Sequence, residues 1–118
     1  MSKIAIEGVD VDRGIYLSGG VEAFYLETLA VYYQECVSRI KDIKNCLASE
    51  NWPKYINNVH ALKSASANIG AGTLSAEAKA LEMAGREDNI SFIKQNTDSL
   101  LKNLELLLQK IKAVLPQN

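Results

Sequence analysis

The residues near the C-terminus follow the spacing of a helix that packs in a bundle. Seven positions alternate steps of three and four residues: Ile93, Thr97, Leu100, Leu104, Leu107, Ile111 and Val114. This alternation is typical of the seam between packed helices, so it predicts one long helix over residues 90–114. Pro116 prevents the helix from continuing.

Two further long segments carry helical spacing. Over residues 21–48 the expected apolar face is Tyr25, Leu26, Leu29, Tyr33, Cys36, Val37, Ile40, Ile43 and Leu47. The next helix is expected to begin after Asn51 as N-cap, with Pro53 in its first turn, where a missing N–H costs nothing. Gly70 is expected to end it.

Two shorter helices complete the pattern. Thr73 is a candidate N-cap for a helix that directs Leu74, Ala78, Leu81 and Gly85 to the core, and residues 86–89 are expected to connect it to the last helix. Near the N-terminus, Asp10 can cap a short helix over residues 11–17, which Gly19 and Gly20 interrupt.

The sequence therefore predicts an all-α fold. Four amphipathic helices with short connections favour an antiparallel up-down-up-down four-helix bundle, with the short N-terminal helix as an addition. A chain of 118 residues fits one domain, so we assign residues 1–118 to it. We expect residues 1–8 to be loosely held.

Composition excludes several classes of function. A net charge of −1 gives no reason to expect nucleic acid as a partner, and no apolar run is long enough for membrane insertion. Cys36 and Cys46 would be separated by about 15 Å along one helix, so we expect no disulfide between them. They belong to no zinc-type cluster, and reduced cysteines favour a cytoplasmic location.

His60 is the only histidine of the chain, and it lies on the flank of the apolar face of its helix. One edge of the ring can therefore face solvent while the other packs against a neighbouring helix. Lys63 adds a cation one turn away that can stabilise an anion at the imidazole. Small side chains at Ser64, Ala67 and Ala71 would let a partner protein approach closely.

A reactive imidazole also needs its other nitrogen held in place. Glu82 lies beside Leu81 on the flank of the next helix, which should pack antiparallel to the helix of His60. Its carboxylate could accept the Nδ1–H of His60 and leave Nε2 free as a nucleophile. It would also stabilise the positive charge that forms on the ring during attack, as in carboxylate–histidine pairs of hydrolytic sites.

These residues together resemble the histidine phosphotransfer (HPt) domains of multistep two-component phosphorelays. The motif residues are His60, Leu62, Lys63, Ser64, Ala67, Ile69, Gly70, Leu74, Leu81 and Glu82, preceded by Asp10, Gly14, Gly20, Phe24 and Tyr25. The resemblance covers nearly the whole chain. One position departs from the family pattern, because Ser64 stands where glycine is usual.

The resemblance implies a phosphorelay intermediate. His60 would accept a phosphoryl group from the aspartate of a response-regulator receiver domain and pass it to another receiver. Lys63 and Glu82 would assist, and Ser64, Ala67 and Ala71 would lie where the receiver docks. The receiver would supply Mg²⁺, so the resemblance implies no cofactor and no metal site in this chain. It implies a phosphotransfer domain without ATP-binding or autokinase elements.

Two questions remain open at this point. The chain is either a free protein, expected as a monomer, or the C-terminal part of a hybrid sensor histidine kinase. The alternative function is a non-catalytic bundle for protein interaction or dimerisation. That alternative needs exposed apolar residues on a second face of the last helix, such as Leu101, Leu108 and Leu115. A di-iron bundle is excluded in practice because it needs more than one histidine.

Overall fold

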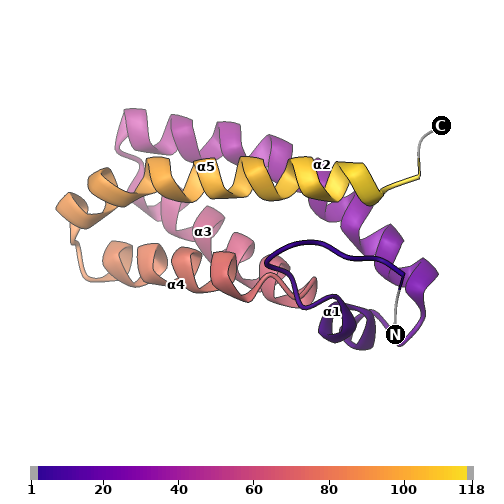
Figure 1. The fold of residues 1–118 in the computed structure, drawn as a ribbon. Coiled ribbons are helices and arrows are strands. Elements are labelled where there is room, and N and C mark those ends of the chain that lie inside the picture. Colours follow the sequence, from indigo (N-terminus) through magenta and orange to yellow (C-terminus); the bar gives the residue numbers. More distant parts are fainter. Residues whose placement is uncertain (1–2, 117–118) are drawn as a thin grey trace.

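The computed structural model describes residues 3–116, and within that range the chain is helical, with no β-strand. Figure 1 shows its helices in chain order: α1 (Val11–Leu17), α2 (Glu22–Ser49), α3 (Trp52–Asn68), α4 (Gly72–Arg86) and α5 (Ile90–Val114). The predicted all-α fold is confirmed, and the helix bounds lie close to those expected from the sequence.

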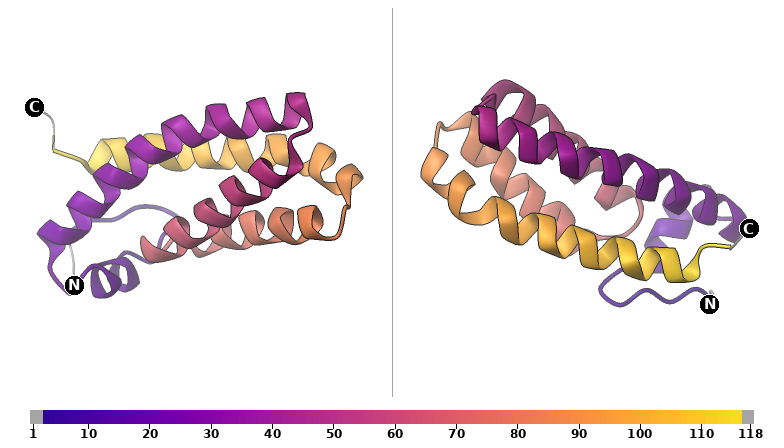
Figure 2. Two further views of the ribbon diagram at one scale, coloured as in Figure 1. Left: turned by 180° about the vertical axis from the view of Figure 1, so that it is seen from behind. Right: turned by 90° about the horizontal axis from the view of Figure 1, so that it is seen from above.

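Helices α2 to α5 form the bundle. Each of α3 and α5 packs against both α2 and α4, so the four helices close around one core (Figure 2). Short connections reverse the chain between them, which gives the predicted antiparallel up-down-up-down order. The most extensive of these helix pairs is α3 with α4. This pair carries His60 on α3 and Glu82 on α4.

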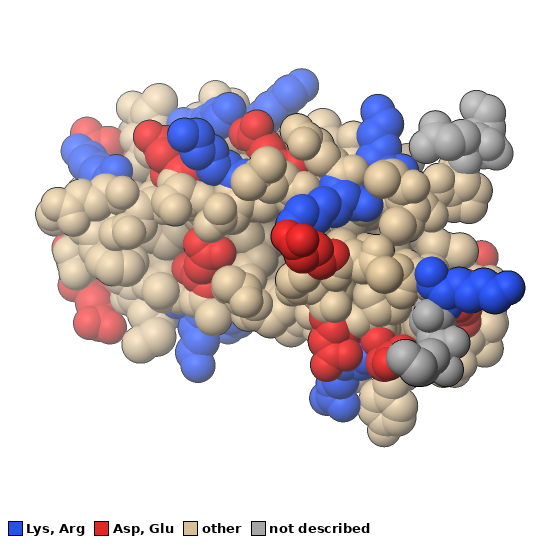
Figure 3. Space-filling view, viewed as in Figure 1, with Lys and Arg blue, Asp and Glu red and all other residues tan. Residues whose placement is uncertain are grey.

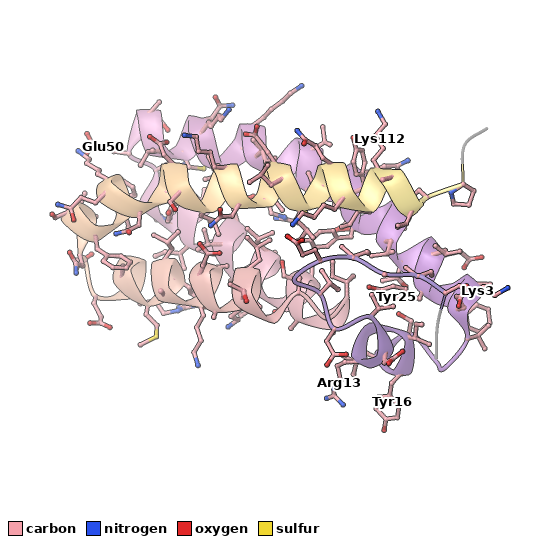
Figure 4. The ribbon with its side chains drawn as sticks, viewed as in Figure 1. Lys3, Arg13, Tyr16, Tyr25, Glu50 and Lys112 are labelled. Atoms are coloured by element: carbon pink, nitrogen blue, oxygen red, sulfur yellow. The ribbon has the colours of Figure 1, made fainter. Side chains whose placement is uncertain are left out.

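Helix α1 lies at one end of the bundle against α2 and α3. Figure 4 shows Arg13 and Tyr16 projecting from it away from the bundle, with the Arg13 guanidinium 5.5 Å from the centre of the Tyr16 ring. On the inner side, the Tyr25 hydroxyl donates to the carbonyl oxygen of Ile69 at 2.8 Å. This contact joins the start of α2 to the end of α3.

The helix caps show where sequence signals were sufficient. The side chains of Asp10 and Asn51 accept hydrogen bonds from backbone N–H groups in the first turns of α1 and α3, as predicted. The prediction of Thr73 as N-cap of α4 is wrong. That helix already begins at Gly72, because a tight turn at Gly70 (φ +87°) returns the chain early and places Ala71 at the N-cap.

The packing register of α2 differs from the expectation at two positions. Tyr32 rather than Tyr33 is the tyrosine buried in the core at this level, and Val37 is 43% exposed. The Tyr32 hydroxyl shares a hydrogen bond of 2.8 Å with the Ser66 hydroxyl of α3. Burial of this polar pair is therefore compensated within the core.

Burial corrects the expectation of a second exposed apolar face on α5. Leu101 and Leu108 on α5 are buried in the core, and Leu115 is half-buried. The exposed second apolar face that a dimerisation bundle would need at these positions is therefore not present. In the segment before α1, Ile6 packs into the core, and the exposed Glu7 pairs with Lys110 at 3.3 Å. Residues 1–2 lie outside the described residues.

Candidate functional site

His60 lies in the middle of α3 with its ring at the surface. Its side chain is 52% exposed, and its Nδ1 atom is 2.7 Å from Oε2 of Glu82 on α4. The antiparallel packing of α3 and α4 brings these residues together across 22 positions of sequence. The contact predicted between His60 and Glu82 is thus present in the structure.

Glu82 is buried, in contrast to the ring that it holds. Its side chain is only 7% exposed, and it is surrounded by three donors. Oε2 accepts from His60 and from Arg86 (Nη2 at 2.8 Å, Nε at 3.2 Å), while Oε1 pairs with Lys63 Nζ at 2.8 Å. Buried carboxylates are tolerated when they are paired and hydrogen-bonded in this way.

The charge state of Glu82 follows from these contacts. Burial acts to raise the pKa of its carboxyl group, but the hydrogen bonds from Lys63, Arg86 and His60 outweigh burial and lower the pKa to about 2. The carboxylate is therefore ionised near neutral pH and can only accept hydrogen bonds. Nδ1 of His60 must carry the proton of their hydrogen bond, which leaves the lone pair of a neutral ring on Nε2.

Lys63 pairs with the carboxylate oxygen of Glu82 that His60 does not contact. It is the residue at i+3 from His60, and its side chain is 28% exposed. The sequence suggested a cation free to meet an anion at the imidazole, whereas the structure pairs Lys63 with Glu82. An ammonium group on a flexible stem can move from one anion to another nearby.

Arg86 was not recognised in the sequence as part of the site. It was assigned to the connection after the fourth helix, but α4 continues through Arg86 and carries its guanidinium back to Glu82 four residues earlier. The Glu–Arg spacing of i, i+4 was a usable signal, because such pairs meet on one face of a helix.

The candidate docking residues do not all share one surface. Ser64 and Ala67 are exposed on the flank of α3, close to His60 in the helical register. Ala71 is only 2% exposed, so its predicted place on the docking surface is wrong. α3 ends at Asn68, close to the end expected at Gly70, and the turn that follows directs Ala71 into the core and away from the surface of Ser64 and Ala67.

The face of the molecule shown in Figure 3 carries mixed charge. In Figure 3, lysine and arginine side chains alternate with aspartate and glutamate on the face viewed, without a region of one sign. None of the described helices has the length and apolar character needed to cross a bilayer. Within residues 3–116, no three side chains of histidine, cysteine, aspartate or glutamate gather as potential metal ligands.

Comparison with known proteins agrees with this geometry. A family model described as Hpt domain matches residues 27–114, a range that includes His60, Lys63, Glu82 and Arg86. The search of curated proteins and the search of solved structures gave no match. Hpt domains are helical phosphotransfer modules of two-component signalling that interact with receiver domains and are not themselves kinases. Since the matched range covers most of the sequence, the chain belongs to the Hpt domain family.

Proposed function

We propose that this chain is a phosphorelay intermediate in which His60 is the phosphorylated residue. The Nε2 lone pair attacks the phosphorus of an aspartyl phosphate on a receiver domain. The bond between phosphorus and the aspartate oxygen breaks, and the aspartate leaves as a carboxylate. In the second half of the relay, a different receiver aspartate takes the phosphoryl group from Nε2.

One observation carries this proposal: the exposed ring of His60 is held through Nδ1 by a buried, ionised carboxylate. This arrangement selects the tautomer whose lone pair is on Nε2 and fixes the orientation of the ring. Among the described residues, Nε2 has no hydrogen-bond partner, so a partner protein can reach it. A histidine that only stabilised the fold would not need a free nitrogen at the surface.

Lys63 and Glu82 are assigned separate roles in the transfer. Glu82 orients His60 and balances the positive charge that develops on the ring. Lys63 moves from Glu82 towards the incoming phosphoryl oxygens and stabilises their charge. Arg86 is a positioning residue, since it contacts Glu82 and keeps the carboxylate ionised when Lys63 moves away.

The partner is assigned the rest of the site. Both oxygens of Glu82 are already engaged by cationic side chains, which leaves that carboxylate poorly suited to bind a metal ion. We therefore infer that the receiver supplies Mg²⁺ and the acidic pocket, and that it docks over Ser64 and Ala67 as a partner of a monomeric bundle. A cytoplasmic location fits two buried cysteines that stay reduced.

The test is transfer of labelled phosphate from a phosphorylated receiver domain to the purified chain. We expect a label on the chain that is labile in acid and stable in base, and that is absent from the His60→Gln variant. Circular dichroism of the variant should match that of the unchanged chain, because the exposed ring contributes little to packing. A label that persists in His60→Gln, or no transfer from any receiver of the same organism, would overturn the proposal.

A further inference from the structure

The residue that holds His60 is a carboxylate, and an amide of the same size would not be chemically equivalent. A glutamine side chain offers both a carbonyl oxygen and an NH₂ group, so it can accept from or donate to a ring nitrogen. Glu82 can only accept, because its pKa of about 2 leaves no proton on the carboxyl group near neutral pH. In the free ring the carboxylate selects the tautomer with a proton on Nδ1, and the difference from an amide matters again once Nε2 carries a phosphoryl group.

Phosphorylation changes what Nδ1 can do. A neutral ring substituted on Nε2 has no proton on Nδ1, whereas a ring that keeps this proton is a cation. At a separation of 2.7 Å, a bare Nδ1 would place its lone pair against a carboxylate oxygen, with no hydrogen between two acceptors. A protonated Nδ1 keeps a charge-assisted hydrogen bond to the same oxygen.

We propose that Glu82 retains the proton on Nδ1 throughout the phosphorylated state, so that the chain holds its phosphoryl group as a phosphoimidazolium. This inference rests on the proposed function of His60. It adds a property of the stored intermediate, namely that the ring is kept in the form from which the phosphoryl group leaves most readily.

The charges that face the ring support the cationic form. Lys63 on α3 and Arg86 on α4 contribute two positive charges, Glu82 contributes one negative charge, and a phosphoryl group fully ionised adds two more. A protonated ring brings this group of charges to neutrality, and a neutral ring leaves it with an excess negative charge.

Two further charged residues, on helices that pack against α3, are cations. On the other flank of α3, Arg39 of α2 contacts Asn58 at 3.2 Å, and Lys79 lies about one turn before Glu82 on α4. Neither residue adds a second carboxylate.

The proton balance of the relay becomes simple in this arrangement. When His60 attacks, Nε2 gains the phosphoryl group while Nδ1 keeps its proton. When the P–N bond breaks towards the second receiver, the electron pair returns to Nε2 and the ring leaves as neutral imidazole. Without the Nδ1 proton the leaving group would be an imidazolate, which is far more basic. No proton therefore has to be moved in either step.

The experiment compares the phosphorylated forms of the unchanged chain and Glu82→Gln. Each is loaded with phosphoramidate, a small phosphoryl donor, and freed of excess reagent. Loss of the phosphoryl group is then followed by ³¹P NMR as a function of pH, together with the ¹⁵N shift of Nδ1. We expect acid-promoted loss of the phosphoryl group to persist in the unchanged chain to a pH about one unit or more above that of Glu82→Gln. At pH values above the midpoints of both rate profiles, the unchanged chain should therefore lose its phosphoryl group about tenfold faster.

Controls separate the possible failures. Glu77→Gln makes the same change on α4 at a residue that contacts Asn103, so it should keep the profile of the unchanged chain. Glu82→Asp retains a carboxylate and should restore part of the shift. If phosphoramidate and receivers both fail to label His60, the proposed function is wrong. If His60 is labelled but the two profiles coincide, only the inference about Glu82 is wrong.

A direct measurement keeps the inference testable even where Glu82→Gln does not fold. In the unchanged phosphorylated chain, the ¹⁵N shift of Nδ1 should be that of a protonated nitrogen near neutral pH. The value for a bare nitrogen under these conditions would overturn the inference without reference to any variant.

Discussion

Lys63 Nζ lies 2.8 Å from Glu82 Oε1, so the cation proposed to meet the phosphoryl group is held by a buried carboxylate before the phosphoryl group arrives. The two residues come from different helices, and the same carboxylate binds His60 through its other oxygen. Glu82 therefore fixes the ring and stores the lysine beside it. Because His60 and Lys63 are three residues apart on α3 and share this carboxylate, the two side chains lie on the same part of the surface.

Replacement of Lys63 by glutamine should slow phosphotransfer while leaving the fold intact. A hydrogen bond to a charged group contributes about 1.5–3 kcal/mol, so we expect the transfer rate to fall about tenfold to a hundredfold. The measurement is the rate of label transfer from a phosphorylated receiver to Lys63→Gln. Lys102→Gln, at an exposed position on α5, is the matched control. An equal rate in both variants would remove Lys63 from the mechanism.

Stability should depend on pH through Glu82. The folded-state pKa of its carboxyl group is about 2, below the ordinary value of 4.5, so the carboxylate stabilises the fold above about pH 4.5. That contribution should be lost as the pH falls from 4.5 towards 2, and it amounts to at most about 3 kcal/mol. Denaturant unfolding of the unchanged chain and Glu82→Gln at several pH values measures it.

The sign of this effect gives a specific expectation for the comparison. The difference in unfolding free energy between the two proteins should be largest near neutral pH and should shrink in acid, where Glu82 becomes protonated. The other carboxyl groups are common to both proteins and cancel. A difference that stays constant from neutral pH to about pH 2 would show that Glu82 is not held in its ionised form by the fold.

The sequence was sufficient for those features that depend on regular helical spacing. The seam of α5 and the caps at Asp10 and Asn51 were predicted from local patterns that the fold preserves. The contact between His60 and Glu82 was also predicted, because antiparallel neighbours with a short connection bring their flanks together. At these positions the local helix preferences of the sequence agree with the tertiary packing of the bundle.

The features that the sequence did not predict depend on where helices end and on the exact periodicity of a long helix. Arg86 belongs to α4, one residue beyond the end expected from the sequence, and Ala71 is buried because the turn after α3 directs it into the core. In α2, a helix of 28 residues, small deviations from ideal periodicity accumulate, so spacing alone could not distinguish Tyr32 from Tyr33. Tertiary packing decides such positions.

The buried pair of Tyr32 and Ser66 should stabilise the bundle as a unit. Their hydroxyl groups are 2.8 Å apart in the core, so removal of either leaves the other without this partner. We expect Tyr32→Phe and Ser66→Ala each to lower the free energy of unfolding by about 1–2 kcal/mol. The double variant should lose less than the sum, with a coupling of about 1 kcal/mol.

A second polar pair provides the control for this coupling. Thr97 shares a hydrogen bond of 2.6 Å with Tyr55 and contacts neither member of the first pair through its hydroxyl. The effects of Tyr32→Phe and Thr97→Val should therefore add. Chemical denaturation of the single and double variants measures both cycles, and additivity within the first pair would contradict the predicted coupling.

Gly14 should tolerate no side chain, because α1 contacts the bundle through it. A Cβ atom there would collide with the Tyr25 ring and with the carbonyl oxygen of Ile69, the two groups joined by a hydrogen bond of 2.8 Å. We expect Gly14→Ala to lower the free energy of unfolding by about 1–3 kcal/mol, as for other overpacked sites.

Gly72→Ala is the matched control, because Gly72 lies in the first turn of α4 and a Cβ there meets no atom within 4 Å. It should be neutral or stabilising by up to about 1 kcal/mol, since alanine restricts the unfolded chain and favours helix. Equal thermal unfolding midpoints for the two variants would show that α1 does not pack against Tyr25 and Ile69 as the structure has it.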